Sequence, residues 1–331
     1  MKTKIYGTFG PACASEEILI KMIECGLTGM RLNLSHSSLR DSKSYVEAYQ
    51  CACEKCGVKP QILIDMQGPE LRIGRVKLEK EVQLGETVTF GEDGIDIPQQ
   101  LFNSVEIGDE ILVDDGKMLL KVISKDSKKV KAKVLRGGIL KSHKSIKIVG
   151  KNVTMPVLTE HDIQNIKEAK TYGVTALMQP FVLCGEELVQ VKEILNQSNA
   201  NDIKIFAKIE NQMGVSNLDC IVPEADVIII ARGDLGNDMP LWELPRVQKK
   251  IEEVCEKYQK PYIVVTQMLA SMEQNPVPTR AEVSDIFHAV MHGAWGVMVT
   301  GETAVGKYPV EVIRYLANTA KEAEDYGTEN V

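Results

Sequence analysis

The sequence predicts an α/β protein, a (β/α)8 TIM barrel with a small all-β domain inserted after the third strand. Three observations predict this fold. Eight short β-branched runs alternate with longer runs of helical period, the pattern of a parallel sheet covered by helices. Eight such pairs close a barrel of about 250 residues, fewer than the 331 residues of this chain. The excess falls in one interval, residues 70–151, where the pattern changes.

Each predicted strand is short and apolar and leads into polar residues. The eight runs lie at residues 3–9, 30–35, 61–66, 176–181, 204–210, 227–232, 262–268 and 296–302. Apolar side chains at helical spacing predict covering helices at 15–25, 38–56, 159–172, 184–197, 214–222, 241–259, 280–292 and 309–326. Helix-start signals support several of them. Ser15 precedes two glutamates, Thr159 has Asp162 three residues on, and Pro309 stands near a helix start.

The interval from Glu70 to Lys151 alternates apolar and polar residues, as in GETVTF and SKKVKAKVLRGG. Turn pairs such as Asp115-Gly116 recur within it. An interval of about 80 residues is too long for a plain loop. We therefore expect the first part of the barrel at 1–69, a β-rich inserted domain at 70–151, and the remainder of the barrel at 152–331.

Composition and charge exclude several classes of protein. The chain is 44% apolar and carries 46 acidic and 39 basic side chains, which excludes a disordered or collagen-like protein. Its formal charge of −7 gives no global attraction to nucleic acid. No stretch approaches the ~20 apolar residues of a membrane helix, and the start MKTKIYGTFGPAC lacks the form of an export signal. Eight cysteines without such a signal predict a reducing, cytoplasmic location, with no membrane and no nucleic acid as partners.

Cys51, Cys53 and Cys56 form a C-x-C-x-x-C cluster inside a predicted helix that ends at Gly57. At about 100° per residue, the three thiols do not share one face of that helix. No second cysteine pair follows at zinc spacing. We interpret these cysteines as packing or solvent-edge thiols rather than as metal ligands.

The strand ends are where we expect chemistry, because all strands of such a barrel open on one face. In the second strand, Arg31, Asn33 and Ser35 alternate to one side. An inward arginine is costly without an anion, so a ligand-binding Arg31 outweighs a core role. The third strand ends with Asp65 at the rim, for which a helix-capping or turn role is the alternative.

The fifth and sixth strands carry a cation and two acids. Lys208 and Glu210 alternate to the same side, with a structural ion pair as the plainer alternative. The sixth strand leads into Arg-Gly-Asp-Leu-Gly, where glycines permit a tight turn and a following helix would direct N–H groups at an anion. Glu210 and Asp234 would then meet at adjacent rims, and two carboxylates with room for water suit Mg²⁺. Thr266 ends the seventh strand, where a hydroxyl is more often structural.

Summed over the strands, the barrel mouth holds cations, two metal-type acids and a helix N-terminus. These groups indicate a phosphate-and-carboxylate site with a divalent ion. Phosphoryl transfer uses such a site, because it needs charge neutralisation and positioning and little covalent work by the protein.

Motifs match a known family nearly end to end. They are TKIYGTFGPAC, RLNLSH, DMQGPELRIG, VDDG, AKIENQMGV, ARGDLG, TQMLASM, PTRAEVSD and TGETAVGKYP. With these motifs the chain resembles the pyruvate kinase family, whose barrel and lid agree with the fold predicted above. The resemblance implies the glycolytic phosphotransferase reaction, in which the phosphoryl group of phosphoenolpyruvate moves to ADP and gives pyruvate and ATP.

The resemblance also implies roles for single residues. Glu210 and Asp234 would hold Mg²⁺ or Mn²⁺. Lys208 would stabilise the charge on the phosphoryl group in flight and on the enolate oxygen, while Arg31 would bind phosphoryl oxygens from another side. Backbone N–H groups of Gly233 and Asp234 would cradle the substrate carboxylate.

Further residues complete the implied site. The Thr266 hydroxyl would lie beside the carboxylate and where the enolate is protonated through water. The resemblance implies a K⁺ site formed by Asn33, Ser35, Asp65 and the carbonyl of Met66. The nucleotide phosphates would meet His36, Arg72 and Lys144.

The chain departs from the family pattern at several positions. Met66 replaces a usual threonine, and Gln67 replaces a usual lysine. Residues 180–183 lose an arginine near the mouth. Glu70 matches family members that require K⁺, whereas an apolar residue at position 66 matches members that do not. We expect K⁺ as a cofactor, and activity without K⁺ stays open as the alternative. A change of phosphoryl acceptor and a phosphoenolpyruvate-binding protein without turnover remain alternatives.

Length and charge complete the expectations. The family normally continues into a C-terminal domain that binds allosteric effectors; this chain stops earlier, so we expect no such domain and a homodimer or monomer rather than a tetramer.

The stretch 121–147 has ten basic residues against one acid. It is interpreted as a solvated lid surface, a phosphate-facing lid edge or an RNA-binding patch, and its lack of interleaved aromatic residues counts against RNA.

Overall fold

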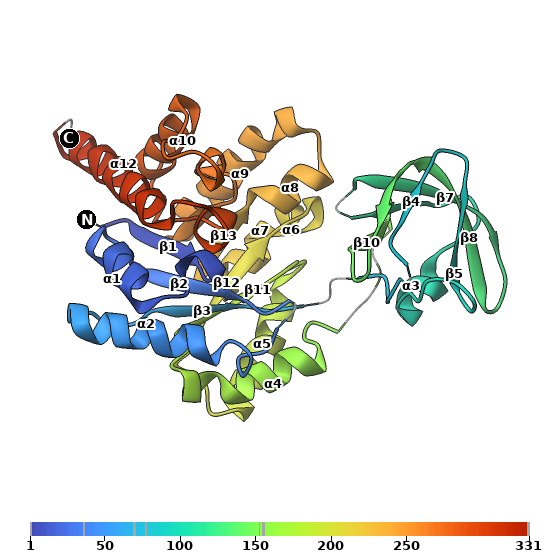
Figure 1. The fold of residues 1–331 in the computed structure, drawn as a ribbon, viewed down its shortest axis with the longest axis horizontal. Coiled ribbons are helices and arrows are strands. Elements are labelled where there is room, and N and C mark those ends of the chain that lie inside the picture. The colour runs from blue at the N-terminus through green and yellow to red at the C-terminus, as the bar shows by residue number, and fades with distance from the viewer. Residues whose placement is uncertain are drawn as a thin grey trace. The chain divides into compact units, whose positions relative to one another are not determined.

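The computed structural model describes residues 2–35, 37–68, 71–76, 78–114, 116–151, 153 and 156–329 (Figure 1). The chain divides into two compact units, one formed by Met1–Gly68 with Val157–Val331 and the other by Pro69–Pro156. The second unit ends five residues beyond the boundary expected from the sequence. One reason is that Val153, which follows the last predicted lid residue, packs against the apolar core of this unit.

The first unit is a closed barrel of eight parallel strands. The predicted (β/α)8 fold is confirmed, and each strand lies within its predicted range or within one residue of it. The strands follow the ring order β1-β15-β14-β13-β12-β11-β3-β2. They are β1 (Lys4–Thr8), β2 (Gly29–Asn33), β3 (Ile62–Asp65), β11 (Ala176–Gln179), β12 (Lys204–Ile209), β13 (Val227–Ala231), β14 (Tyr262–Val265) and β15 (Gly296–Met298).

Helices cover the outside of this barrel (Figure 1). They are α1 (Glu16–Glu24), α2 (Lys43–Cys56), α4 (Glu160–Ala169), α5 (Gly185–Gln197), α6 (Gln212–Ser216), α7 (Leu218–Ile221), α8 (Arg232–Asp238), α9 (Leu244–Lys257), α10 (Arg280–Met291), α11 (Gly301–Ala304) and α12 (Pro309–Glu329). Short 3-10 turns are η1 (Pro11–Cys13), η2 (Lys170–Tyr172), η3 (Val222–Glu224), η4 (Leu241–Glu243) and η5 (Ala270–Glu273).

Some helix predictions need correction. The single helix expected at 214–222 is the pair α6 and α7, followed by the turn η3. The helix expected from residue 38 begins at Lys43. Two short helices carry too few apolar residues to show a period: α8, which follows β13 directly, and α11, which begins shortly after β15. The predicted start signals are confirmed at Ser15, which accepts a hydrogen bond from the N–H of Ile18, and at Thr159.

Alternation along the strands separates two apolar layers. Tyr6, Leu63 and Phe206 belong to the cluster that fills the barrel, together with Ile229 and Ile263. Their chain neighbours, such as Ile5, Ile205 and Ile228, belong to the larger cluster that packs strands against helices. Because side chains two residues apart share a face, the inward series continues into polar residues at the strand ends.

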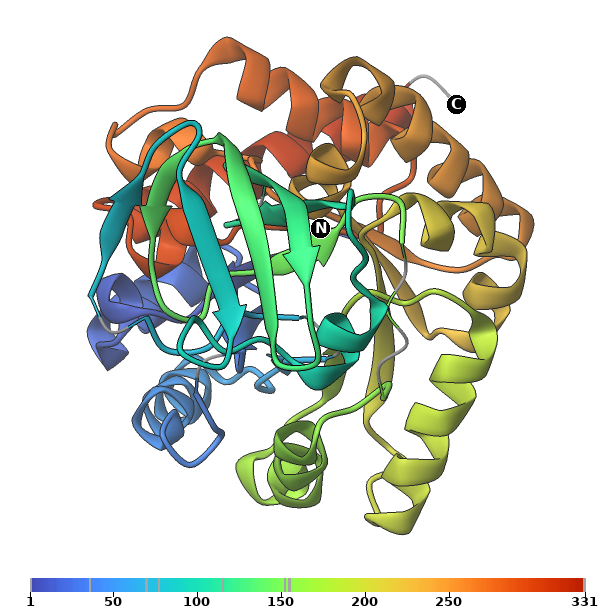
Figure 2. The same cartoon turned by 90° about the vertical axis from the view of Figure 1, so that its right-hand side faces the viewer.

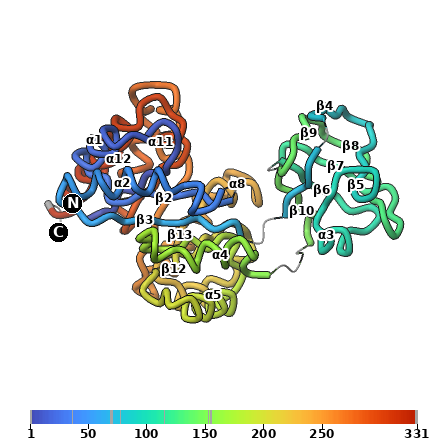
Figure 3. The backbone as a smooth tube through the Cα atoms, turned by 60° about the horizontal axis from the view of Figure 1, so that its bottom comes forward, coloured from blue at the N-terminus to red at the C-terminus, as the bar shows by residue number. Residues whose placement is uncertain are grey.

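The first and last parts of the barrel unit lie side by side (Figure 3). Oε1 of Glu324 on α12 accepts hydrogen bonds from the backbone N–H groups of Lys2 (2.8 Å) and Thr3 (2.5 Å). Strand β1 in turn pairs with β15, with Lys4 opposite Gly296. These contacts close the ring between the two ends of the described chain.

The second unit is mainly β-structure with its own apolar core (Figure 2). A five-stranded antiparallel sheet has the order β10-β6-β7-β8-β5, and β4 pairs with β9. Its elements are β4 (Lys80–Val82), β5 (Thr87–Gly91), α3 (Gln99–Ser104), β6 (Glu110–Val113), β7 (Met118–Lys125), β8 (Lys129–Arg136), β9 (Gly138–Leu140) and β10 (Ile146–Ile148). The expectation of an all-β unit missed α3, which buries Leu101 in that core.

Two absences hold for the described residues. No helix among them is long and apolar enough to cross a membrane. No three His, Cys, Asp or Glu side chains within the described ranges are grouped so that they could hold a metal ion. On α2, Cys53 is buried, Cys51 is exposed and Cys56 is half-buried, so the three thiols have different surroundings, as expected.

Asp162 joins the two chain segments that connect the barrel to the insert. It is fully buried and forms a capping box with Thr159 at the start of α4. Its carboxylate also accepts hydrogen bonds from the N–H groups of Gln67 (2.8 Å) and Gly68 (3.0 Å), where the chain leaves β3. One side chain therefore fixes both the outgoing and the returning segment.

We predict that Asp162→Ala lowers the free energy of unfolding of the barrel by about 2–4 kcal/mol, because it removes a helix cap and leaves two N–H groups without their acceptor. Urea unfolding followed by circular dichroism measures this. Glu160→Ala, an exposed change in the same first helical turn, is the control. Equal stability of the two variants would contradict the role of Asp162.

Candidate active site

Four charged side chains meet at the end of the barrel interior where the strands finish. Asp65 ends β3, Arg31 comes from β2, Lys208 from β12, and Glu210 follows β12. Arg31 contacts Oδ2 of Asp65 through Nη2 (2.6 Å) and Nε (2.9 Å). Lys208 Nζ lies 3.2 Å from each oxygen of Asp65 and 2.7 Å from Oε1 of Glu210. The structure thus brings these four predicted residues together in one alternating cluster.

The cluster is almost closed to solvent. The side chains of Arg31 and Lys208 are each 13% exposed, whereas those of Asp65 and Glu210 are 4% and 1% exposed. Charges buried to this degree are tolerated because each has a partner of opposite sign. The two cations keep the small exposed fraction, so an incoming anion would meet them first.

Mutual attraction outweighs burial for two members of the cluster. Burial alone would raise the pKa of Asp65, but the charges of Lys208 and Arg31 overcome it and hold the pKa below its ordinary value. Burial alone would lower the pKa of Lys208, but the charges of Asp65 and Glu210 raise it above the ordinary value. Asp65 is therefore ionised and Lys208 is a cation at neutral pH.

For Glu210, unlike Asp65, the effect of burial on the pKa outweighs the attraction of the neighbouring cation. Burial raises the pKa of Glu210 to about 7, partly offset by Lys208 and reinforced by the negative charges of Asp234 and Asp65. Its Oε2 accepts a hydrogen bond from the N–H of Phe181 (2.7 Å). Its Oε1 is buried and lies near Lys208 Nζ, but no donor hydrogen is aligned with it. Glu210 and the nearby Asp234 fit a divalent cation, because Oε1 of Glu210 is poorly satisfied by hydrogen bonds. Such a cation would lower the pKa of Glu210.

The end of β14 brings Thr266 close to α8. Thr266 has a φ of 80° and Gln267 a φ of 56°, both in the left-handed region, which is rare for a β-branched residue such as threonine. A Cβ added to Gly233 would lie 2.9 Å from Cγ2 and 3.4 Å from Oγ1 of Thr266. Gly233 therefore permits the backbone at the start of α8 to approach the Thr266 side chain. Gly233 and Thr266 thus lie close together, while their expected contact with a substrate carboxylate stays a prediction.

The residues expected to hold K⁺ lie at the ends of β2 and β3. Asn33 is the register partner of Asp65, and Oδ1 of Asn33 accepts hydrogen bonds from the N–H (3.1 Å) and hydroxyl (2.7 Å) of Ser35. Met66 buries its side chain and donates its N–H to the carbonyl of Met178 (3.1 Å). The oxygen atoms of these residues are donors of the type that hard cations take.

The residues expected at the nucleotide phosphates are not all in the barrel unit. His36 lies outside the described residues. Arg72 and Lys144 belong to the second unit, where the N–H of Ile73 donates to the Lys144 carbonyl (2.9 Å) and Arg72 Nη1 donates to the His143 carbonyl (2.7 Å). Lys144 also pairs with Asp114 (2.8 Å). The structure therefore brings Arg72 and Lys144 together within their own unit.

Sequence reasoning missed three residues of the site. Thr8 accepts a hydrogen bond from Arg31 (3.3 Å), and its alternation with Tyr6 in β1 was the available signal. Phe181 holds Glu210 through its backbone N–H, for which no side-chain pattern exists. Arg232 donates to the Thr266 carbonyl through Nη2 (2.8 Å) and Nε (3.2 Å), and its place directly before Gly233 was the available signal.

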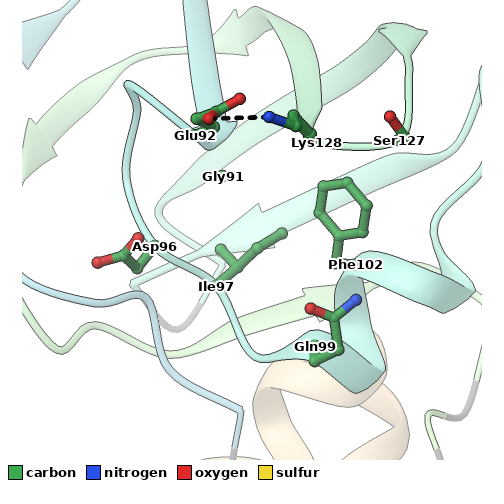
Figure 4. A pocket seen from close by; sticks show the side chains of 8 residues that line it. All are labelled: Gly91, Glu92, Asp96, Ile97, Gln99, Phe102, Ser127 and Lys128. Atoms are coloured by element: carbon green, nitrogen blue, oxygen red, sulfur yellow. Dashed lines mark hydrogen bonds and ion pairs between the residues drawn. The ribbon is translucent and has the colours of Figure 1, made fainter.

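Hollows of the surface also lie elsewhere. One of about 340 Å³ in the second unit is lined by residues that include Phe102, Ile97, Glu92 and Lys128 (Figure 4). Two of its three charged residues, Glu92 and Lys128, pair with each other at 3.2 Å, and the third is the acid Asp96. Because this hollow offers no unpaired cation among these residues and none of the strand-end side chains, the cluster at the barrel mouth is the stronger candidate site.

A sequence model of the pyruvate kinase barrel domain matches residues 1–313. The chain belongs to the pyruvate kinase family. A pyruvate kinase of Bacillus licheniformis is 38% identical over 98% of this chain, and one of Aeropyrum pernix is 37% identical over 97% of it. The pyruvate kinase of Staphylococcus aureus strain MRSA252 is 37% identical over 98% of the chain.

The chain spans part of the length of these relatives. It covers 57% of the Bacillus and Staphylococcus proteins and 70% of the Aeropyrum protein. Membership of the pyruvate kinase family is therefore established for the barrel and its insert, which together form the described structure. The resemblance drawn from the motifs is confirmed at the level of the family.

We predict that Asp65→Asn lowers the free energy of unfolding by about 3–5 kcal/mol at pH 7, because it leaves Arg31 and Lys208 facing each other without their shared anion. The native pKa of Asp65 lies below its ordinary value of about 3.9, so its stabilisation is fully present above that pH and is lost as pH falls through the native pKa.

The stability gap between wild type and this variant should widen as pH falls from 8 to about 5.5 in urea titrations, because the charge of Asp65 helps to raise the pKa of Glu210 to about 7 and so opposes ionised Glu210 only in the wild type. Asp202→Asn, which weakens an exposed pair with Lys170, is the matched control and should change stability by less than about 0.5 kcal/mol. An equally small effect of Asp65→Asn would show that the cluster does not depend on this carboxylate.

Proposed function

We propose that the protein transfers the phosphoryl group of phosphoenolpyruvate to ADP and gives pyruvate and ATP. The single observation that carries this proposal is the buried Lys208, held between Asp65 and Glu210 beside Arg31, at the mouth of a barrel of the pyruvate kinase family. A cation in this position can neutralise a transferring phosphoryl group and an enolate, and a closed site strengthens that attraction.

Substrate binding follows from the charges. Arg31 can direct unoccupied guanidinium hydrogens at phosphoryl oxygens, since its other hydrogens are taken by Asp65 and Thr8. The carboxylate of the substrate would be bound by the N–H groups of Gly233 and Asp234, with the Thr266 hydroxyl beside it. The close packing of Gly233 on Thr266 supports this placement.

Two cations complete the proposed site. Members of this family generally use Mg²⁺ and K⁺. Glu210 and Asp234 would hold Mg²⁺ or Mn²⁺, which supplies positive charge to the phosphoryl and carboxylate oxygens. Asn33, Ser35, Asp65 and the Met66 carbonyl would hold K⁺, which adds a further positive charge near the phosphoryl group.

The reaction balances with few protein groups. An oxygen of the terminal ADP phosphate attacks phosphorus, the bond from phosphorus to the enol oxygen breaks, and the bonding pair remains on the enolate. Lys208 stabilises the charge on both sides of this transfer. A proton then adds to the enolate methylene carbon, delivered from water that the Thr266 hydroxyl orients, because a threonine hydroxyl is itself a poor acid.

The nucleotide and the setting of the enzyme belong to the same proposal. His36, Arg72 and Lys144 would contact the phosphates of ADP, which is supported by the proximity of Arg72 and Lys144 in the second unit. The lid assignment of 70–151, the cytoplasmic location and a homodimer or monomer stay predictions from the sequence.

The deciding experiment is pyruvate formation from phosphoenolpyruvate and ADP with Mg²⁺, measured with and without K⁺. Turnover establishes the kinase, and the comparison with Na⁺ of equal ionic strength decides what Met66 and Glu70 mean together. Other nucleoside diphosphates test for a different acceptor. Binding of phosphoenolpyruvate without turnover of any acceptor would overturn the proposal in favour of a binding protein.

Lys208→Met should lower kcat by about 1,000-fold, because it removes the cation that stabilises the transferring group while keeping side-chain length. Binding of Mg²⁺ and phosphoenolpyruvate, followed by calorimetry, should be largely spared. Lys204→Met on the same strand, where Lys204 pairs with Asp226 at the surface, is the control and should retain activity. Substantial turnover by the Lys208 variant would refute its role.

Glu210→Gln should weaken binding of Mn²⁺ by about tenfold or more, because an amide replaces an anionic ligand. Electron paramagnetic resonance titration of free Mn²⁺ measures this without any need for turnover. The buried Glu252→Gln on α9, outside the barrel mouth, is the matched control. A Glu210 variant with the affinity of the wild type would remove this residue from the ligand set.

A further inference from the structure

The backbone that carries the Thr266 hydroxyl is held in an unfavourable conformation. Two successive residues after β14, Thr266 and Gln267, have positive φ. Such a conformation is strained for a residue other than glycine and persists only where the surroundings enforce it. The neighbours of Thr266 should therefore include a group that fixes this turn.

Arg232 is that group. It is the first residue of α8 and its side chain is 12% exposed. Two of its guanidinium nitrogens converge on the Thr266 carbonyl, Nη2 at 2.8 Å and Nε at 3.2 Å. Nη2 also lies 2.9 Å from Sδ of Met268, two residues further along the same turn.

Arg232 is itself oriented from a third element. Oδ1 of Asp285 on α10 accepts a hydrogen bond from Nη1 of Arg232 (2.9 Å), and Oδ2 of Asp285 pairs with Nη2 (2.8 Å). This two-point pairing leaves the planar guanidinium with one orientation, the one in which its other edge faces the Thr266 carbonyl. A lysine has neither the plane nor the number of fixed donors to make both contacts together.

A second contact with the same turn comes from the residue after Arg232. Gly233, which follows Arg232, is in close contact with the Thr266 side chain. The Arg232 side chain therefore holds the carbonyl of Thr266, and the Gly233 backbone lies against the Thr266 side chain, nearest to its methyl Cγ2. A shift of the turn would move Thr266 relative to the N–H groups of Gly233 and Asp234.

We propose that Arg232, oriented by Asp285, is a positioning residue that fixes the Thr266 hydroxyl for proton delivery to the enolate. This inference rests on the proposed function and assigns to Arg232 no contact with substrate. Misplacement of a reacting group by about 1 Å can cost about 100-fold in rate, so loss of the fork should act on kcat.

The test is steady-state kinetics of Arg232→Lys, with exchange of the pyruvate methyl hydrogens for deuterium in D2O followed by NMR. In that exchange a C–H bond of the methyl group breaks to give the enolate, and a deuteron from solvent replaces the proton. We expect kcat and the exchange rate to fall together by about 10- to 100-fold, with KM for phosphoenolpyruvate within about threefold of wild type.

Two further variants complete the design. Asp285→Asn keeps side-chain size and should lower kcat and the exchange rate in the same direction but less, and the double variant should lose less than the product of the two effects. Arg246→Lys, which alters a surface pair with Glu243, should leave both rates unchanged.

Each other outcome overturns the inference. If the wild type turns over and Arg232→Lys keeps full activity, the inference is overturned while the proposed function stands. Should Arg232→Lys not fold, full activity of Asp285→Asn overturns the inference in the same way. A rise in KM at unchanged kcat, or a loss of kcat with unchanged methyl exchange, would assign Arg232 to substrate binding or to phosphoryl transfer instead. Absence of turnover in the wild type overturns the proposed function and this inference together.

Discussion

One buried carboxylate holds the barrel mouth together. Asp65 accepts from Arg31 and from Lys208, which come from strands on opposite sides of it in the ring, and so keeps two like charges at a short distance. Lys208 in turn holds Glu210, so that cations and anions alternate. The two cations are thereby held close together in a cluster whose formal charges balance, and the anionic substrate proposed above would meet both of them.

The apolar interior below the cluster explains why the charges are so close. Tyr6, Leu63 and Phe206 fill the barrel, and the next inward position on their strands is polar: Thr8, Asp65 and Lys208. The packed layer excludes water beneath the charged one, which strengthens the pairing and makes removal of a single partner costly. The stability of the fold and the electrostatics of the site therefore both depend on which side chains of each strand point into the barrel.

The sequence predicted most of this arrangement and missed a definable remainder. Strand periodicity and alternation sufficed for the barrel, for its insert and for the inward direction of Arg31 and Lys208. The bounds of the short helices α8 and α11 escaped because helices of seven and four residues are too short to show a clear period. The contacts of Phe181 and Arg232 escaped because they involve a backbone N–H and a backbone carbonyl, and their partners are distant in sequence. The assignment of Glu210 and Asp234 to Mg²⁺ rests on residue type and stays a prediction, whereas the burial of Glu210 could be seen only in three dimensions.

The carboxylate of Asp162 has a consequence for folding. It ties residues 67 and 68, where the chain leaves the barrel, to the start of α4, where the chain has returned. To the barrel, the whole insert is thus a loop with anchored ends, and loop-closure entropy grows only with the logarithm of length, about 0.6 kcal/mol for each doubling. A long independent unit with its own apolar core can be carried at this position at little thermodynamic cost to the strands on either side, and its sequence is free to vary without disturbing their pairing.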